Sequence, residues 1–470
     1  MTFRHIFYLG ITILCAHSYK DWFPSLCGLI LMMAVIRYEN MPTTMYGIQG
    51  LNPWNFLFAV TFVAWLASRR REGLKWDMPR HISVLLVMYL GVILVGFLRA
   101  VFDRSHLEGY PLKSLISEEL VNTVKWVLPG ILLFDGCRTR RRLIMAIVCL
   151  LVMYSLIAVQ VVRRLPAGSV LHAGGSIERT RKACEDIGYT ACDLSTCLAG
   201  ASWGIMATLP LVRRKKYKAL ILAAASAVAF GQALTGGRAG YLAWGAIGLV
   251  LCFLKWRKYL ILAPVIVILL PIVLPGAVER MLAGFGQTDV AGENVIDDYL
   301  VTSGRTLVWP HVIDKIGESP MVGYGRLAMK RTGLADQFMS DDFPHPHNMY
   351  LETLLDNGII GSIPILLFWG TLVVYAARLF KSDNLLCSTV GGVALSLMLA
   401  QLFAGIGSQH FYPEESTLGV WAAMFLAIRV YVEQSRVREG AIVTEGNWNS
   451  QALQRQQAAI PAISTQKITE

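Results

Sequence analysis

Long apolar runs, separated by short polar stretches, recur along most of the chain. One of them, residues 81–102 (HISVLLVMYLGVILVGFLRAVF), would form a helix about 33 Å long, which is enough to cross the core of a bilayer. We therefore expect an all-α, polytopic membrane protein with about 12–13 transmembrane helices and one large, partly helical loop domain outside the membrane. The predicted spans are residues 3–18, 22–37, 53–68, 81–102, 119–135, 143–162, 192–211, 219–234, 240–254, 259–276, 358–380, 385–407 and 416–432.

Composition and charge support a membrane protein. Hydrophobic residues make up 54% of the chain and charged residues 16%, whereas soluble domains carry about 25% charged residues. The net charge of +11 does not indicate nucleic-acid binding, because the basic residues cluster in short loops between predicted spans. Positive charge in short loops is typical of the cytoplasmic side of a membrane. The clusters are Arg69–Arg71, Arg138–Arg142, Arg213–Lys218 and Lys255–Lys258.

The order of these clusters predicts which segments face outward. Two spans separate each neighbouring pair of clusters, so all four clusters lie on one side. Residues 103–118, 163–191 and 277–357 then lie on the other side. The side of the amino terminus stays open, because it depends on whether the two short first segments both cross. The expected division is a transmembrane bundle (1–276), a large outward loop with a histidine (277–357), three further spans (358–432) and a cytoplasmic tail (433–470), disordered from about Glu439.

Two short helices are predicted near the large loop. Apolar positions at Leu307, Val308, Val312 and Ile313 have helical spacing and indicate an amphipathic helix over 305–316. A second helix should run from Asn348 to Asp356, with Asn348 as its N-cap, and the sequence DNG then predicts a turn at Gly358.

Nine cysteines are scattered along the chain, without CxxC pairs or zinc-ligand spacing. We therefore expect no metal site and no cofactor. Cys184 and Cys192 lie near one outward segment, where they either pair in an oxidising environment or stand as two unrelated small apolar residues.

The histidines before the second short helix are candidates for chemistry. His347 would lie at the positive end of a helix dipole, which favours the neutral imidazole that a general base needs. His345 precedes it by two residues and is a candidate for binding, together with Asn348. A histidine that only closes the loop by hydrogen bonding would fit the same pattern.

Three arginines are candidates for binding an anion on the outward side. Arg238 lies between two spans in TGGRAG, Arg305 begins the amphipathic helix in SGRTLVW, and Arg326 lies in GYGRL. A guanidinium matches phosphate oxygens in a bidentate arrangement. The alternatives are an arginine that reaches lipid phosphates and a solvated surface arginine. Taken together with His347, Arg238 and Arg305 indicate catalysis on a lipid-linked diphosphate, in which the two arginines neutralise the leaving group and the histidine takes a proton from the attacking hydroxyl. Arg326 is a weaker candidate.

These motifs resemble the O-antigen ligase superfamily. The ligase pattern of His, Asn, nine residues, Gly, two residues and Gly is present from His347 to Gly361. The arginine between helices resembles Arg238, and the start of the large periplasmic loop resembles Ser303, Gly304 and Arg305 with Trp309. The resemblance covers roughly residues 190–432 in order and spacing.

The resemblance implies an inverting, metal-independent membrane glycosyltransferase of the bacterial inner membrane, with its site facing the periplasm. It implies His347 as the catalytic residue and an undecaprenyl-diphosphate-linked glycan as the donor. The acceptor would be lipid A-core if the protein is a ligase. Two other acceptors stay open: a growing glycan, as in a polymerase, and a protein, as in an oligosaccharyltransferase. A transporter of lipid or sugar and a non-catalytic scaffold are the competing classes. Glu352, His410, Glu414 and Glu415 either shape the acceptor pocket or are neutral surface residues.

Overall fold

The structure of the protein is a computed structural model. It describes residues 3–438 except for 37–40, 43, 46–49, 166, 169–176, 283–286, 289–293, 296–301, 339–343 and 409. The predicted disordered tail from Glu439 lies outside the described residues. In the first half of the chain the helices are α1 (Phe3–Ser18), α2 (Phe23–Met32), α3 (Pro53–Arg71), α4 (Arg80–Phe102), α5 (Leu112–Leu115), the π-helix η1 (Ile116–Asn122), α6 (Thr123–Lys125), α7 (Leu128–Gly136), α8 (Arg140–Arg164), α10 (Ile177–Glu185), α11 (Ala191–Met206), the 3₁₀ turn η2 (Leu209–Leu211) and α12 (Lys215–Leu234).

The described part of the second half is helical as well, apart from one short antiparallel pair, β1 (Gln287–Thr288) and β2 (Asn294–Val295). This confirms the all-α prediction. Helices α17 and α19 begin where the two short helices of the loop were predicted. The elements are α13 (Arg238–Leu254), η3 (Arg257–Ile261), α14 (Leu262–Val273), α15 (Pro275–Met281), α17 (Arg305–Glu318), α18 (Ala328–Arg331), η4 (Ala335–Phe338), α19 (Met349–Lys381), α20 (Leu385–Ala404), η5 (Glu415–Thr417) and α21 (Leu418–Arg438).

All the predicted spans are mainly helical, and the protein is a multi-pass membrane protein. Among the described residues, seven helices are long and apolar enough to cross a membrane alone, or eight if the bent pair around α14 and α15 counts as one span. This number is smaller than the 12–13 predicted. Helices α1, α2 and α13 are short, α3 carries three arginines in its last turn, and the predicted span 119–135 is divided among η1, α6 and α7.

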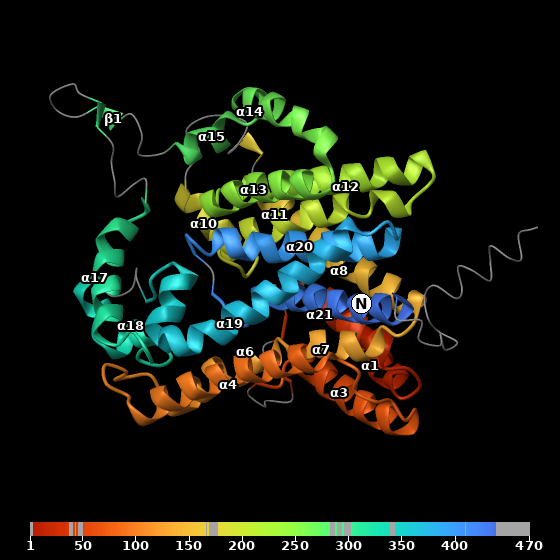
Figure 1. The fold of residues 1–470 in the computed structure, drawn as a ribbon, viewed down its shortest axis with the longest axis horizontal. Helices are drawn as coiled ribbons and strands as arrows, with labels where there is room; N and C mark the ends of the chain where they lie inside the picture. Colours follow the sequence, from red (N-terminus) through yellow and green to blue (C-terminus); the bar gives the residue numbers. More distant parts are fainter. Residues whose placement is uncertain are drawn as a thin grey trace, which may run out of the picture.

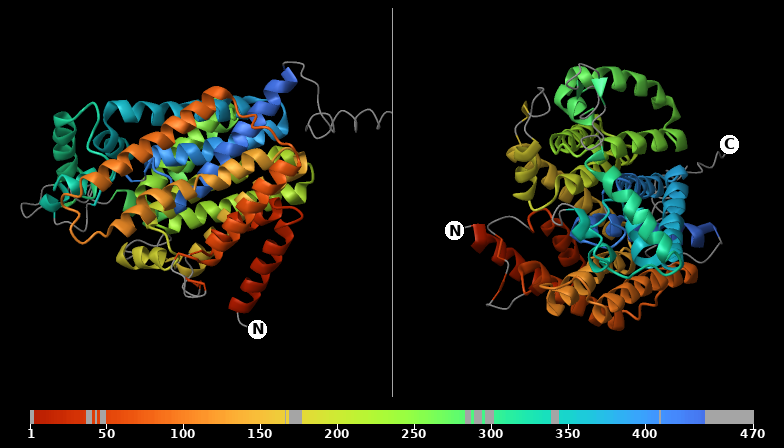
Figure 2. Two further views of the ribbon diagram at one scale, coloured as in Figure 1. Left: turned by 90° about the horizontal axis from the view of Figure 1, so that it is seen from below. Right: turned by 90° about the vertical axis from the view of Figure 1, so that its left-hand side faces the viewer.

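The long helices lie side by side in one bundle, and α17 and α18 lie beyond one end of it (Figures 1 and 2). Its core joins helices far apart in sequence: α20 packs against α11, α13, α19 and α21. Apolar side chains on the outside of the bundle remain exposed, as on α14, none of whose residues is buried. A lipid-facing surface explains why these side chains are exposed, because lipid tails are as apolar as the side chains.

The loops fall into two groups at opposite ends of the bundle, as the basic clusters predicted. At one end, Asp77 forms ion pairs with Arg138, Arg429 and Arg436. At the other end, Gly96 of α4 accepts a hydrogen bond from the Arg326 backbone. Because α4 runs from one group of contacts to the other, the Arg138–Arg142 cluster and the large loop are separated by most of the length of a spanning helix.

A sharp bend in α19 connects the large loop to the membrane part. Gly358 has a φ of +59°, and a Cβ added there would come within 2.4 Å of the Met321 backbone. The bend leaves backbone groups of α19 without helical partners, and the glycine-rich turn satisfies them. Tyr324 N donates to Leu355 O (2.9 Å), and Ile359 N donates to Pro320 O (2.9 Å). The turn predicted at Gly358 therefore positions residues 320–325 against the helix.

Candidate functional site

The histidine loop is held immediately before α19. Asn348 caps this helix, since its side-chain oxygen accepts from the backbone N–H groups of Tyr350 (3.0 Å) and Leu351 (3.2 Å). His347 has a φ of +50°, which is unusual for a residue with a side chain. Trp309 of α17 donates from Nε1 to Pro346 O at 2.9 Å. The predicted N-cap is thus in place, and it presents His347 in a strained backbone conformation.

Three imidazoles meet at this loop. The ring of His345 lies 4.2 Å from that of His347 and 4.5 Å from that of His410, measured between centroids. Nδ1 of His345 accepts from the His347 backbone N–H at 3.3 Å. Burial, reinforced by the charge on His410, lowers the pKa of His345 to about 3. His345 is therefore neutral, with its proton on Nε2.

His410 is the opposite case. Burial works against its charge, but the Glu352 carboxylate, which forms an ion pair with Nδ1, outweighs burial and raises the pKa of His410 to about 9. Sequence analysis gave His410 and Glu352 as separate candidates for shaping the acceptor pocket. The structure joins them across 58 residues of sequence.

A buried charge cluster lies behind these histidines. Arg326 pairs with Glu119 (2.7 Å), Glu352 (3.4 Å) and Asp356 (3.6 Å), and its guanidinium stacks 3.6 Å from the centre of the Tyr412 ring. Burial alone would lower the pKa of Arg326, but these carboxylates and Tyr412 raise it well above its usual value. The guanidinium of Arg326 is thus directed at internal partners. Sequence analysis predicted that Arg326 binds substrate. Given these internal partners, we propose instead that Arg326 positions Glu352.

Sequence reasoning missed three members of this cluster. Glu119 was assigned to the start of a span, and Asp356 was assigned only to the DNG turn. Tyr412 donates to Asp356 Oδ2 at 2.8 Å, and Asn357 Nδ2 donates to the Tyr412 hydroxyl at 2.8 Å. The available signal was a pair of carboxylates, Glu352 and Asp356, on the same face of a helix at the membrane edge.

The other two arginines meet on a neighbouring surface. Arg238 Nη2 donates to Ser303 Oγ at 2.5 Å, and Arg305 donates from Nη1 to Thr302 O at 2.8 Å. Arg305 also donates from Nη2 to Gly407 O. Its Nε is buried and has no hydrogen-bond partner among the described residues. Burial lowers the pKa of Arg305, as does the positive charge of Arg238 close by.

The loop after α20 connects the arginines to the histidines. Gly407 contacts Arg305 and lies beside Ala239, which follows Arg238. Two residues earlier, Gly405 O accepts from Met349 N at 2.8 Å, directly after the histidine loop. The structure therefore brings the segments carrying Arg238, Arg305 and His347 to the same end of the bundle.

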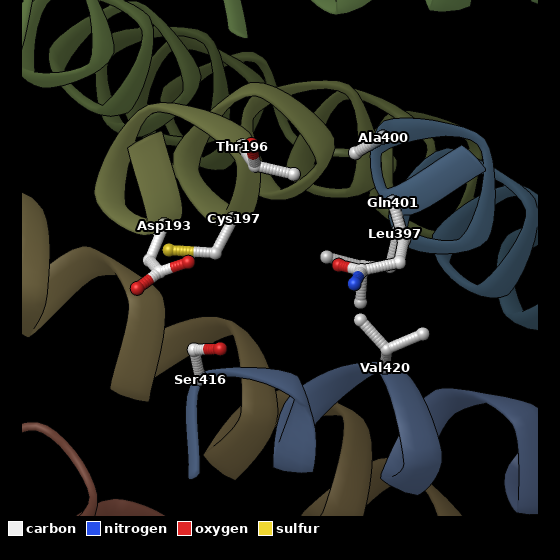
Figure 3. Close-up of a pocket in the computed structure, with 8 residues that line it drawn as sticks. All are labelled: Asp193, Thr196, Cys197, Leu397, Ala400, Gln401, Ser416 and Val420. Carbon is white, nitrogen blue, oxygen red and sulfur yellow. The ribbon is translucent and has the colours of Figure 1, made fainter. Parts of the chain in front are cut away.

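A small cavity lies between α11, α20 and the start of α21 (Figure 3). Gln401, on its wall, donates from Nε2 to His410 O at 3.0 Å. Cys184 and Cys192, near the same end, are both free thiols. Among the described residues no group of three or more His, Cys, Asp or Glu side chains could hold a metal ion. The cavity is lined by Asp193, Thr196 and Cys197 of α11, Leu397, Ala400 and Gln401 of α20, Ser416 of η5 and Val420 of α21.

The ion pair between His410 and Glu352 predicts pH-dependent stability. Because the pKa of His410 is raised in the folded protein, the pair stabilises the fold fully below about pH 6.5 and loses this contribution as pH rises through about 9. We expect the free energy of unfolding of the wild type to exceed that of a His410→Gln variant by up to about 3 kcal/mol at pH 6. At pH 10 the two free energies of unfolding should differ little. Thermal unfolding in detergent over this range measures the difference. A difference that does not change with pH would contradict the prediction.

Comparison with known proteins agrees with this geometry. Residues 219–366 match the family model described as O-antigen ligase, and this segment contains Arg238, Arg305 and His347. A protein of Rickettsia conorii named "Putative polysaccharide ligase RC0486" is 31% identical over 104 residues, which is 20% of this chain and 25% of the relative. The chain thus matches about a quarter of that relative's length. The motif from His347 to Gly361 lies within residues 219–366, the segment that is similar to the O-antigen ligase family.

Proposed function

We propose that the protein transfers a glycan from an undecaprenyl-diphosphate-linked donor to an acceptor hydroxyl, at the periplasmic face of the bacterial inner membrane. The transfer is inverting and independent of metal ions, and the acceptor is lipid A-core, as in an O-antigen ligase. The family match and the relative's name support glycan ligation, while the donor, the acceptor and the side of the membrane are part of the proposal.

The buried Nε of Arg305 carries the proposal. Both terminal nitrogens of Arg305 are bound to backbone carbonyls, whereas Nε–H has no partner among the described residues. A buried donor without a partner costs about 1–3 kcal/mol. A phosphate oxygen at this position would remove the cost and would also offset the charge that Arg305 shares with Arg238.

His347 supplies the other half of the reaction. Its imidazole takes the proton from the acceptor hydroxyl as the oxygen attacks the anomeric carbon of the donor sugar. The bond between that carbon and the diphosphate oxygen breaks, and undecaprenyl diphosphate leaves with the bonding electron pair. Arg238 and Arg305 stabilise the negative charge on the departing oxygen. A single displacement of this kind inverts the anomeric centre.

The neighbouring residues hold His347 in place. Nδ1 of His345 accepts from the His347 backbone N–H, and the Glu352–His410 ion pair lies against His345. A strained φ at His347 is maintained only where surrounding contacts determine it, and such strain is common at active sites. The predicted binding role of His345 and Asn348 is therefore one of positioning in this proposal.

Deletion of the gene, followed by analysis of cell-surface and lipid-linked glycans, tests the function. We expect long chains to disappear from lipopolysaccharide while undecaprenyl-linked chains remain. Single repeats attached to the core would overturn the ligase assignment in favour of a polymerase, and loss of glycan from proteins alone would overturn it in favour of a protein oligosaccharyltransferase. An unchanged glycan profile would contradict glycan transfer itself.

A further inference from the structure

Arg280 is a further arginine at the outward end of the bundle, and the proposed reaction does not use it. It lies in α15, and only 8% of its surface is exposed. Its Nη2 donates to Thr180 Oγ1 at 3.0 Å. No carboxylate of the described side chains forms an ion pair with it. Removing a charged group from water is costly unless an opposite charge compensates, so a buried guanidinium with this environment indicates an anionic ligand.

Arg280 lies directly against the TGGRAG turn. A Cβ added to Gly236 would come within 2.1 Å of Arg280 Nη1, so the guanidinium rests on the backbone of this glycine, two residues before Arg238. Gly236 also has a φ of +72°, which a residue with a side chain adopts only with strain. The sequence TGG before Arg238 thus makes room for Arg280 as well as forming the turn.

The position of α14 suggests which part of the donor Arg280 contacts. The chain bends by 103° at Leu274, between α14 and α15, six residues before Arg280. Helix α14 lies on the outside of the bundle (Figure 1), and its side chains from Leu262 to Val273 include several large apolar groups that are at least 40% exposed. A polyprenyl tail lying along this surface would bring its first phosphate to the level of Arg280.

We propose that Arg280 binds the lipid-proximal phosphate of the donor, whereas Arg238 and Arg305 bind the phosphate attached to the sugar. This inference rests on the proposed function. The lipid-proximal phosphate does not change in the reaction, because the bond that breaks lies on the sugar side of the other phosphate. Binding by Arg280 is therefore equal in the ground state and the transition state, and its loss should raise KM and leave kcat nearly unchanged.

The experiment uses the full-length protein in nanodiscs and three probes: undecaprenyl diphosphate, undecaprenyl phosphate and undecaprenol. Undecaprenyl phosphate has only the lipid-proximal group, so it reports on Arg280 separately. We expect Arg280→Gln to weaken binding of both phosphorylated lipids by roughly 10–100-fold and to leave undecaprenol binding unchanged. Arg305→Gln should weaken binding of the diphosphate alone. Arg181→Gln is the matched control, because Arg181 follows Thr180 in α10 and its side chain is 62% exposed.

The outcomes separate this inference from the proposed function. Wild-type protein that binds undecaprenyl diphosphate no better than undecaprenol would contradict the proposed donor. Wild-type preference for the diphosphate, together with normal binding of both phosphorylated lipids by Arg280→Gln, would overturn the role of Arg280 alone. An equal loss of undecaprenol binding would indicate a purely structural role and would also overturn it. If Arg280→Gln is not produced, Arg280→Lys keeps the charge and should show a smaller loss on the same two lipids.

Discussion

Replacing His347 by alanine should lower the rate of glycan transfer about 10²–10⁴-fold, the usual contribution of a general base. The proton of the acceptor hydroxyl would then have no group to receive it as the oxygen attacks. Transfer to lipid A-core in a deletion strain complemented with the variant measures the effect, and the protein level in the membrane should be normal. Because His347 has a φ of +50°, His347→Asn is a useful second variant, since asparagine tolerates this conformation better than alanine.

His311→Ala is the control for this experiment. His311 lies on α17 in the same loop domain and is exposed. Its Nδ1 contacts the Leu307 carbonyl of its own helix at 3.0 Å, and its ring packs edge-on against Phe338. We expect its activity to match the wild type. Normal transfer by both His347 variants would rule out His347 as the general base and would leave the diphosphate site without its proposed chemistry.

Replacing Arg305 by glutamine should lower kcat about 10²–10³-fold, the range found when one donor to a developing oxyanion is removed. Charge accumulates on the departing diphosphate only as the sugar bond breaks, so this interaction is stronger in the transition state than in the ground state. Kinetics with purified protein and a lipid-linked donor would separate kcat from KM. The expected pattern is the reverse of that for Arg280, for which KM changes.

Two comparisons make the Arg305 experiment decisive. Lys315→Gln removes a positive charge from the exposed end of the same helix, where Lys315 pairs with Glu318 at 2.6 Å, and should have little effect. Arg305→Lys keeps the charge but loses the Nε–H donor, so it should recover only part of the rate. Full activity of Arg305→Lys would mean that charge alone suffices and that the buried Nε–H contributes nothing.

His345 and His410 differ in how their protonation is set. His345 is kept neutral by burial, and His410 is kept charged by Glu352. Two imidazoles within 4.5 Å of each other thus have opposite protonation states because only one of them has a carboxylate partner. The fixed positive charge on His410 makes protonation of the neighbouring His345 still less favourable.

Local sequence determined the elements of this protein. Helix formation depends on residues three and four positions apart, so the apolar runs, the Asn348 cap and the glycine at the bend are all visible in the sequence. The alternation of basic loops also determined which loops share an end of the bundle, because charge in short loops acts on each span separately. His347, Arg238 and Arg305 could be proposed for one site because all three were predicted on the same side of the membrane and all three match the family motifs.

Only the tertiary structure decided which charges neutralise one another. Arg326 and Arg305 look alike in sequence, since each follows a glycine in the same outward loop. Arg326 is surrounded by Glu119, Glu352 and Asp356, whereas Arg305 retains a buried Nε–H without a partner. The pairing of His410 with Glu352 and the packing of Arg280 on Gly236 are likewise contacts between distant segments. The physical reason is that a charge is compensated by whatever packing brings near it, and packing between helices has no local sequence signature.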